Sequence, residues 1–100
     1  MGNRGNIILK YENNQKVCFY THWTGTDLPE ILKEALVRGK PRWNDSSYLA
    51  RIIFSEMIKD NVLDETGYGI APYPIDSGVE IEIDFNNLTA NGIKFEDYIK

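Results

Sequence analysis

The stretch from residue 44 to residue 59 constrains the fold more than any other part of the chain. Its apolar residues cover most of the circumference of an α-helix. The polar residues that interrupt this pattern are spaced by four and form one stripe: Ser47, Arg51, Ser55 and Lys59. A helix that is apolar on most sides is usually buried on most sides. We therefore predict a central packing helix here, capped by Asn44 or Asp45.

A second helix is predicted immediately before it, over residues 27–38. Its apolar residues follow the spacing of one helical stripe: Leu28, Ile31, Leu32, Ala35 and Leu36. Asp27 is a suitable N-cap, and Glu30 three residues later completes the capping-box spacing. Gly39 is expected to end the helix.

The N-terminal part of the chain reads as a β-hairpin. Alternating apolar and polar residues predict strands over 6–11 and 16–22, joined by a polar turn. The second strand carries aromatic residues on both faces, so we expect it to be central and covered by helices on at least one face.

The C-terminal part predicts a second hairpin. Residues 79–85 alternate more clearly than any other segment, and a short antiparallel partner is expected over 92–96. Residues 61–74 read as a loop. Together these elements predict one α+β domain over residues 1–100, with an N-terminal β-hairpin, two consecutive α-helices and a C-terminal β-hairpin. We expect both hairpins to join in one antiparallel sheet packed on the helices.

Composition narrows the class of protein. The apolar share of 42% and the charged share of 26% are those of a soluble globular domain. No apolar run approaches the ~20 residues of a membrane span, so no membrane association is expected. A single cysteine, Cys18, excludes an intrachain disulfide and suits a reducing compartment, where we expect it to be a small buried hydrophobe. The first six residues lack the apolar core of a signal peptide, which favours a cytoplasmic location.

The charges are unevenly distributed along the chain. The net charge is −4, yet residues 33–51 carry five basic and two acidic residues, whereas residues 60–84 carry seven acidic residues and no basic one. The acidic segment would repel nucleic acid, so direct DNA or RNA binding is not expected.

Residues 20–27 join the end of a predicted strand to the start of a helix. Such a junction directs backbone N–H groups and the positive end of a helix dipole at a ligand. His22, Trp23, Thr24 and Gly25 lie there, with an aromatic face for stacking a ring. The alternative is a core tryptophan beside a histidine that is bonded to the backbone.

Two other segments carry residue types that bind ligands. Cations lie beside an indole at Arg42 and Trp43, and two glycines that permit close backbone approach flank Tyr68. The full set of candidate ligand-binding residues is His22, Trp23, Thr24, Gly25, Arg42, Trp43, Arg51, Gly67, Tyr68 and Gly69. No phosphate-binding or dinucleotide-binding motif is complete, so no cofactor is predicted. Glu80, Glu82 and Asp84 are read as the solvated face of a strand rather than as metal ligands.

Four stretches together resemble a family of small, mostly uncharacterised proteins of bacteria and their phages. They are Tyr20–Gly25, Arg42–Asp45, Tyr48–Phe54 and Thr66–Ile70, and the similarity runs over roughly residues 6–99. The resemblance implies a phage or mobile-element accessory protein, such as a counter-defence factor acting in the cytoplasm of a bacterial host cell.

Three functions follow from these observations. The first is a non-enzymatic binder that sequesters a nucleotide-like immune signal, as an anti-defence sponge. The second is an inhibitor of a bacterial defence protein that presents the acidic residues 60–84 to a basic groove, as DNA mimics do. The third is a small phosphodiester hydrolase in which His22 is the general base.

A chain of this length has little room to enclose a nucleotide-sized ligand, so we expect a homo-oligomer with its pocket between subunits. Exposed aromatics and Met57 on the second helix, with Ile8 on the outer face of the first strand, are expected to supply the interface surface.

Overall fold

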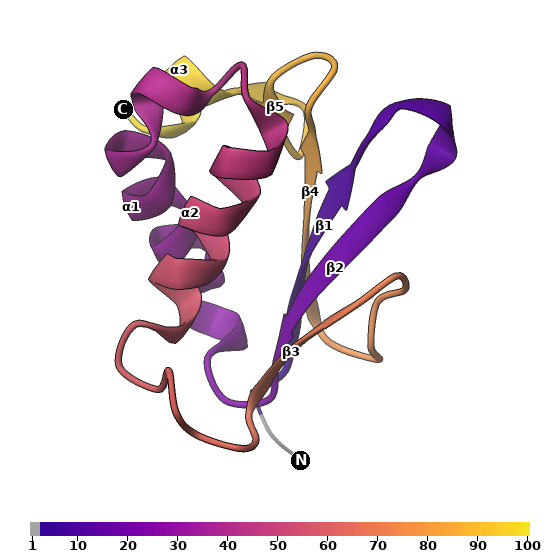
Figure 1. Ribbon diagram of the computed structural model, residues 1–100, viewed down its shortest axis with the longest axis vertical. Coiled ribbons are helices and arrows are strands. Elements are labelled where there is room, and N and C mark those ends of the chain that lie inside the picture. Colours follow the sequence, from indigo (N-terminus) through magenta and orange to yellow (C-terminus); the bar gives the residue numbers. More distant parts are fainter. Residues whose placement is uncertain (1–2) are drawn as a thin grey trace.

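The computed structural model describes residues 3–100 and shows two layers, with helices packed on one face of a sheet (Figure 1). The helical layer consists of α1 (Leu28–Arg38) and α2 (Ser46–Ile58), and the short α3 (Phe95–Tyr98) lies at one end of it. The sheet contains β1 (Gly5–Lys10), β2 (Lys16–Thr21), β3 (Tyr68–Ala71), β4 (Val79–Asp84), β5 (Thr89–Ala90) and β6 (Ile93–Lys94). The α+β class is therefore confirmed.

Both long helices form where the periodicity places them and begin at predicted N-cap residues, Asp27 and Asp45, but neither side chain makes a capping bond. A 3₁₀ turn, η2 (Gly25–Asp27), runs directly into α1, so Asp27 already has helical backbone angles and its side chain makes no capping bond. Asn3 supplies the cap instead, because its Oδ1 accepts a hydrogen bond from Thr26 N at 3.0 Å. Asp45 is the N-cap residue of α2, also without a side-chain capping bond.

The N-terminal hairpin is present, and the two terminal halves of the chain do join in one sheet of order β3-β2-β1-β4-β5-β6. The prediction of a purely antiparallel sheet is wrong, because β1 pairs with β4 in parallel. β3 runs parallel to β1, and the chain then crosses β2 and β1 before it forms β4. Because of this crossing, β4 lies next to β1 and runs in the same direction as β1 and β3.

The crossing segment, residues 72–78, is fastened to the sheet by one buried amide. Asn6 is fully buried, and its Oδ1 accepts a hydrogen bond from Ile75 N at 2.9 Å. Its Nδ2 donates to the Ile75 carbonyl at 2.8 Å and to Ser77 Oγ at 2.9 Å. Every hydrogen-bonding atom of this side chain therefore has a partner, which removes the cost of burying it.

Two strand predictions are corrected at the C-terminal side of α2. Residues 68–71 are not loop but the edge strand β3, which pairs with β2. The partner of β4 is β5 rather than residues 92–96, because Asn91 and Gly92, with φ of 51° and 82°, form a tight turn between β5 and β6. Phe95 then begins α3.

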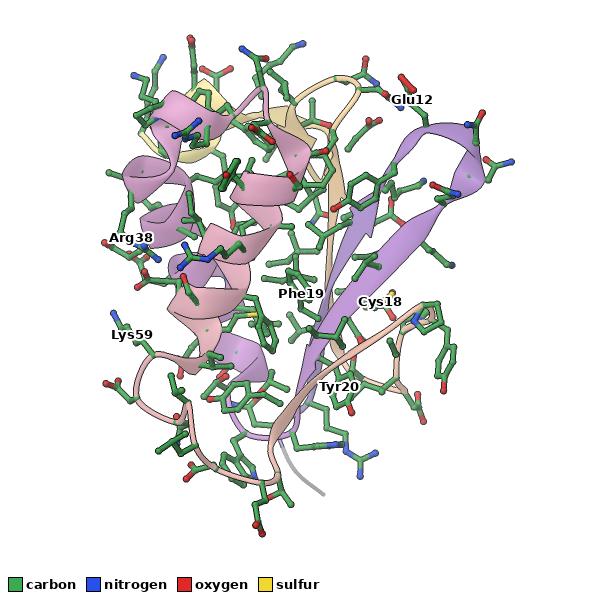
Figure 2. All side chains as sticks on the ribbon, viewed as in Figure 1. Glu12, Cys18, Phe19, Tyr20, Arg38 and Lys59 are labelled. Atoms are coloured by element: carbon green, nitrogen blue, oxygen red, sulfur yellow. The ribbon has the colours of Figure 1, made fainter. Side chains whose placement is uncertain are left out.

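The core lies between the sheet and the helices. Figure 2 shows Phe19 on the helix side of β2, whereas Cys18 and Tyr20 lie on the other side. Both Ile8 and Met57, which were expected to be exposed interface residues, are buried at 6% and 4% exposure, so that prediction is wrong. The core residues with no exposed surface are Ile7, Leu9, Leu28, Leu32, Ala35, Leu36, Leu49, Ile53, Ile83 and Ala90.

Candidate functional site

The structure brings two of the three predicted groups together. The turn after β2 lies beside the segment before β3, at the lower end of the molecule in Figure 1. His22 N donates a hydrogen bond to the Gly67 carbonyl at 2.8 Å. Residues 22–25 and 67–69 are therefore neighbours, as a shared site requires.

Trp23 lies on the backbone of Gly67. A Cβ atom at Gly67 would come within 2.6 Å of the indole ring, and φ at this glycine is 99°. The Tyr68 ring meets Trp23 edge-to-face, with centroids 5.9 Å apart. The indole is still 49% exposed, so it presents apolar surface at the molecule's edge.

The two other predicted glycines have packing roles. The Tyr20 ring lies against Gly69, where a Cβ atom would clash with it, and Gly25 is buried against the backbone of Arg4. His22 is half-buried, with its ring 5.5 Å from that of Tyr20.

The backbone N–H groups of this junction are already used inside the chain. Those of Trp23 and Thr24 donate to Thr21 Oγ1, each at 3.1 Å. The remaining donors and their acceptors are Gly25 with the Asn3 carbonyl, Thr26 with Asn3 Oδ1, and Asp27 with the Thr24 carbonyl. The expectation that this turn offers free N–H groups to an anion is therefore wrong.

The third predicted group lies at the other end of the helices. Trp43 follows the short turn η3 (Lys40–Arg42) near α3, at the top of Figure 1. Its indole is buried, donates from Nε1 to the Leu36 carbonyl at 3.0 Å and packs against Phe95 with centroids 5.4 Å apart. Trp43 is thus a core residue.

The predicted cations do not reach the junction residues either. The Arg42 guanidinium lies over the Tyr48 ring, 4.9 Å from its centroid. Arg51 is exposed on α2. The ten predicted residues therefore divide between two ends of the molecule, and the cations lie apart from the exposed indole.

A groove that sequence reasoning missed lies beside the junction. It has a volume of about 370 Å³ and runs between α1, the C-terminal end of α2 and the segment that follows α2. Ile31, Met57 and Tyr68 supply its apolar surface. The acidic residues that line it are Asp27, Glu30, Glu34, Glu56 and Asp60. Of the predicted site residues, Thr24 and Tyr68 line this groove.

One of these carboxylates is neutralised by bases. Glu56 is 9% exposed, lies 3.0 Å from Arg38 Nη2 and accepts a hydrogen bond from Lys59 Nζ at 2.8 Å. The hydrogen bond from Lys59, reinforced by Arg38, lowers the pKa of Glu56. Both bases lie on the outer side of the helices (Figure 2).

The other four carboxylates form no ion pair with any residue between 3 and 100. Lys59 also lines the groove, and its pKa is raised. The hydrogen bond to Glu56 and the charge of Glu56 are the main causes, and the charges of Asp60 and Glu34 add to them. Asp27, Glu30 and Glu34 are spaced by three and four along α1, so they share one helix face. That spacing is the sequence signal that could have revealed the groove.

The segment after α2 carries exposed apolar residues next to groove residues in the sequence. Val62 is 60% exposed and Leu63 is 92% exposed, directly after the groove residues Asp60 and Asn61. Trp23, also exposed, precedes the groove residue Thr24 and packs against the groove residue Tyr68. We call Trp23, Val62 and Leu63 the apolar margin below.

Two of the acidic residues of β4 have polar partners within the chain. Glu82 lies 3.6 Å from Lys10 Nζ. Asp84 accepts hydrogen bonds from Asn86 N at 2.8 Å and from Asn87 Nδ2 at 2.9 Å, so it shapes the turn after β4. Cys18 is fully buried, and this burial raises the pKa of its thiol, which keeps it protonated and unreactive.

Two features of residues 3–100 bear on the class of site. No helix within residues 3–100 has the length and apolar content needed to cross a bilayer. In the same range no three His, Cys, Asp or Glu side chains are grouped as a metal site would require. Comparisons with protein-family models, with curated proteins and with solved structures gave no match.

Proposed function

We propose that this chain is a non-enzymatic binding protein that holds a basic segment of another protein in its acidic groove. The observation that carries the proposal is the groove itself, in which four carboxylates without a cationic partner among residues 3–100 surround an apolar floor. This is a form of the protein-inhibitor hypothesis, but the acidic surface is a groove beside α1 rather than residues 60–84, and it receives the basic segment instead of entering a basic groove.

The chemistry of the groove matches lysine and arginine side chains. Their alkyl stems pack on apolar surface while their charged ends reach polar rims. Here the stems would lie on Ile31 and Met57, and the charged ends would meet Glu30 and Glu34. Complementary charge of this kind raises the association rate and sets specificity.

The apolar margin gives the partner a place to anchor. Large exposed apolar side chains at the edge of a polar surface mark protein-binding sites. Leu63 projects almost fully into solvent, and Trp23 is an aromatic of the type that dominates binding energy at interfaces. We therefore expect the partner segment to combine basic residues with at least one apolar residue.

The charge distribution favours this function over sequestration of a nucleotide. A phosphate group needs cations or free N–H groups, whereas the groove is lined mainly by carboxylates and the N–H groups of the junction are occupied. Nucleotide sequestration, hydrolysis by His22 and the phage counter-defence role stay predictions from the sequence.

Titration with short peptides tests the proposed function. The probes are lysine- and arginine-rich peptides that contain one leucine, compared with the same peptides in which glutamate replaces the basic residues. We expect the basic peptides to bind, to shift the NMR signals of residues 27–34 and 60–68, and to weaken as salt rises, because exposed charges are screened.

A pair of double variants separates the groove from overall charge. Glu30→Lys with Glu34→Lys, and Glu80→Lys with Glu82→Lys, each replace two negative charges with two positive ones and bring the net charge from −4 to 0. The first pair should lower affinity at least tenfold, and the second, on β4, should have little effect. Equal losses from both pairs, or tighter binding of a cyclic dinucleotide than of any basic peptide, would overturn the proposal.

A further inference from the structure

A second cavity, of about 410 Å³, lies at the end of the molecule away from the acidic groove. It is open to solvent and is bordered by the β1–β2 turn, the residues that precede α2 and the turn after β4. Glu12, labelled in Figure 2, marks the hairpin end of this region. The proposed protein-binding function makes no use of this cavity.

The side-chain amides of the chain are distributed unevenly around the fold. Of ten asparagine and glutamine residues, all between residues 3 and 100, five form hydrogen bonds through their side chains. These five are Asn3, Asn6, Asn61, Asn87 and Asn91. The fold uses them to hold turns and crossing segments in place.

The other five amides gather at the second cavity. Four of them line it, namely Asn13, Gln15, Asn44 and Asn86, and the fifth, Asn14, lies in the same turn. None of these five side chains bonds to another residue in the described part of the chain. The amides that the fold leaves free thus converge on one hollow.

Aromatic rings form another part of the wall. Tyr11 and Phe85 pack with centroids 4.9 Å apart and an interplanar angle of 51°, and both line the cavity. Partial burial raises the pKa of Tyr11, so its hydroxyl stays protonated and can donate a hydrogen bond. The Ser46 hydroxyl also lines the cavity, and Glu12 is the only charged residue that does so.

We infer that this cavity binds a neutral saccharide. A primary amide offers one acceptor and two donors, which matches sugar hydroxyl groups that both donate and accept. The apolar face of a sugar ring packs on an aromatic side chain, and a few placed polar groups then fix its orientation. The near absence of charge selects against phosphates, carboxylates and cations. The volume is at the lower end for small-molecule sites, which suits one or two sugar rings.

Heteronuclear NMR titration of the folded chain tests this inference. The probes are glucose, galactose, N-acetylglucosamine and maltose, with glucose 6-phosphate as the charged comparison. We expect saturable shifts with at least one neutral sugar, confined to residues 11–15, 43–46 and 85–86. The dissociation constant should be millimolar, because few contacts offset the cost of association.

The β1–β2 turn provides a matched pair of variants. Asn13 and Asn14 both have a left-handed backbone, with φ of 63° and 62°, which glycine accepts readily. Asn13→Gly removes an amide that lines the cavity, whereas Asn14→Gly removes one that does not. We expect about a fivefold loss of sugar affinity from the first, the effect of one neutral hydrogen bond, and no loss from the second.

Asn86→Ala is a second test that leaves this turn unchanged, and it should also weaken binding about fivefold. The absence of saturable shifts with every neutral sugar would overturn the inference. So would shifts that map to the acidic groove, a preference for glucose 6-phosphate, or equal losses from the two glycine variants.

Discussion

Replacing Trp43 with alanine should destabilise the domain severely, although the residue was predicted to bind a ligand. The indole is buried, and its Nε1 satisfies the carbonyl of Leu36, one of the last carbonyls of α1 that have no partner within the helix. Truncation of a buried tryptophan to alanine costs about 3–5 kcal/mol. Of this, about 1 kcal/mol is the hydrogen bond, and about 1 kcal/mol is the edge-to-face contact with Phe95.

Two variants separate these contributions. Trp43→Phe keeps an aromatic ring against Phe95 and loses the N–H donor, so we expect a cost of about 2 kcal/mol. A double-mutant cycle between Trp43 and Phe95 should give a coupling energy of about 1 kcal/mol. Trp23→Ala is the comparison, because that indole is 49% exposed and should cost about 1 kcal/mol or less.

Urea unfolding followed by far-ultraviolet circular dichroism measures all of these variants without using tryptophan as the probe. For a slope of ~1–2 kcal/mol/M, the Trp43→Ala midpoint should fall by ~2 M or more. A Trp43→Ala midpoint no lower than that of Trp23→Ala would refute this account of the core. It would also restore Trp43 as a candidate for ligand binding.

Two further predictions concern single contacts. Gly67→Ala forces a left-handed backbone on alanine and places its Cβ within 2.6 Å of the Trp23 ring, so urea unfolding should show a loss of about 2 kcal/mol, with a red shift of tryptophan emission in the folded state. Gly78→Ala, where a Cβ would meet open space, should change stability by less than about 0.5 kcal/mol. The pKa of Glu56 is lower in the folded than in the unfolded chain, so the stability it adds is present above the unfolded pKa and is lost as pH falls through the folded one. Glu56→Gln should therefore cost about 1–2 kcal/mol at pH 7, and the difference from the parent chain should shrink below about pH 4; a difference independent of pH would contradict the ion pairs.

Local patterns in the sequence were sufficient for the helices and for the first hairpin. The stripe from Leu28 to Leu36 and the alternation from Val79 to Asp84 each report on burial of one face, which is a local property. The parallel pairing of β1 with β4 is not local. It depends on the hydrogen bonds by which Asn6 holds the crossing segment at Ile75. The hydrophobic periodicity around these two residues does not indicate that they are in contact.

The candidate site shows the same difference between local features, which the sequence predicts, and contacts between distant residues, which it does not. His22 to Gly25 and Gly67 to Gly69 were grouped correctly, because a strand end and a glycine turn tend to lie at one edge of a sheet. Trp43 was wrongly included in this group, because a tryptophan next to basic residues gives the same sequence pattern whether its side chain is buried or exposed. The acidic groove was missed because Asp60 completes it from the turn after α2, so the acidic spacing along α1 could have revealed only one of its walls.

The parallel pairing of β1 with β4 also bears on how the chain folds as the ribosome makes it. The strand nearest the N-terminus has one of its two neighbours at residues 79–84, so its open edge cannot be covered until those residues have left the exit tunnel. Until then, β1, β2 and both long helices emerge with one edge of the sheet unpaired, an arrangement that invites pairing with other chains. Contacts between such distant segments also slow folding relative to a helical bundle of the same length.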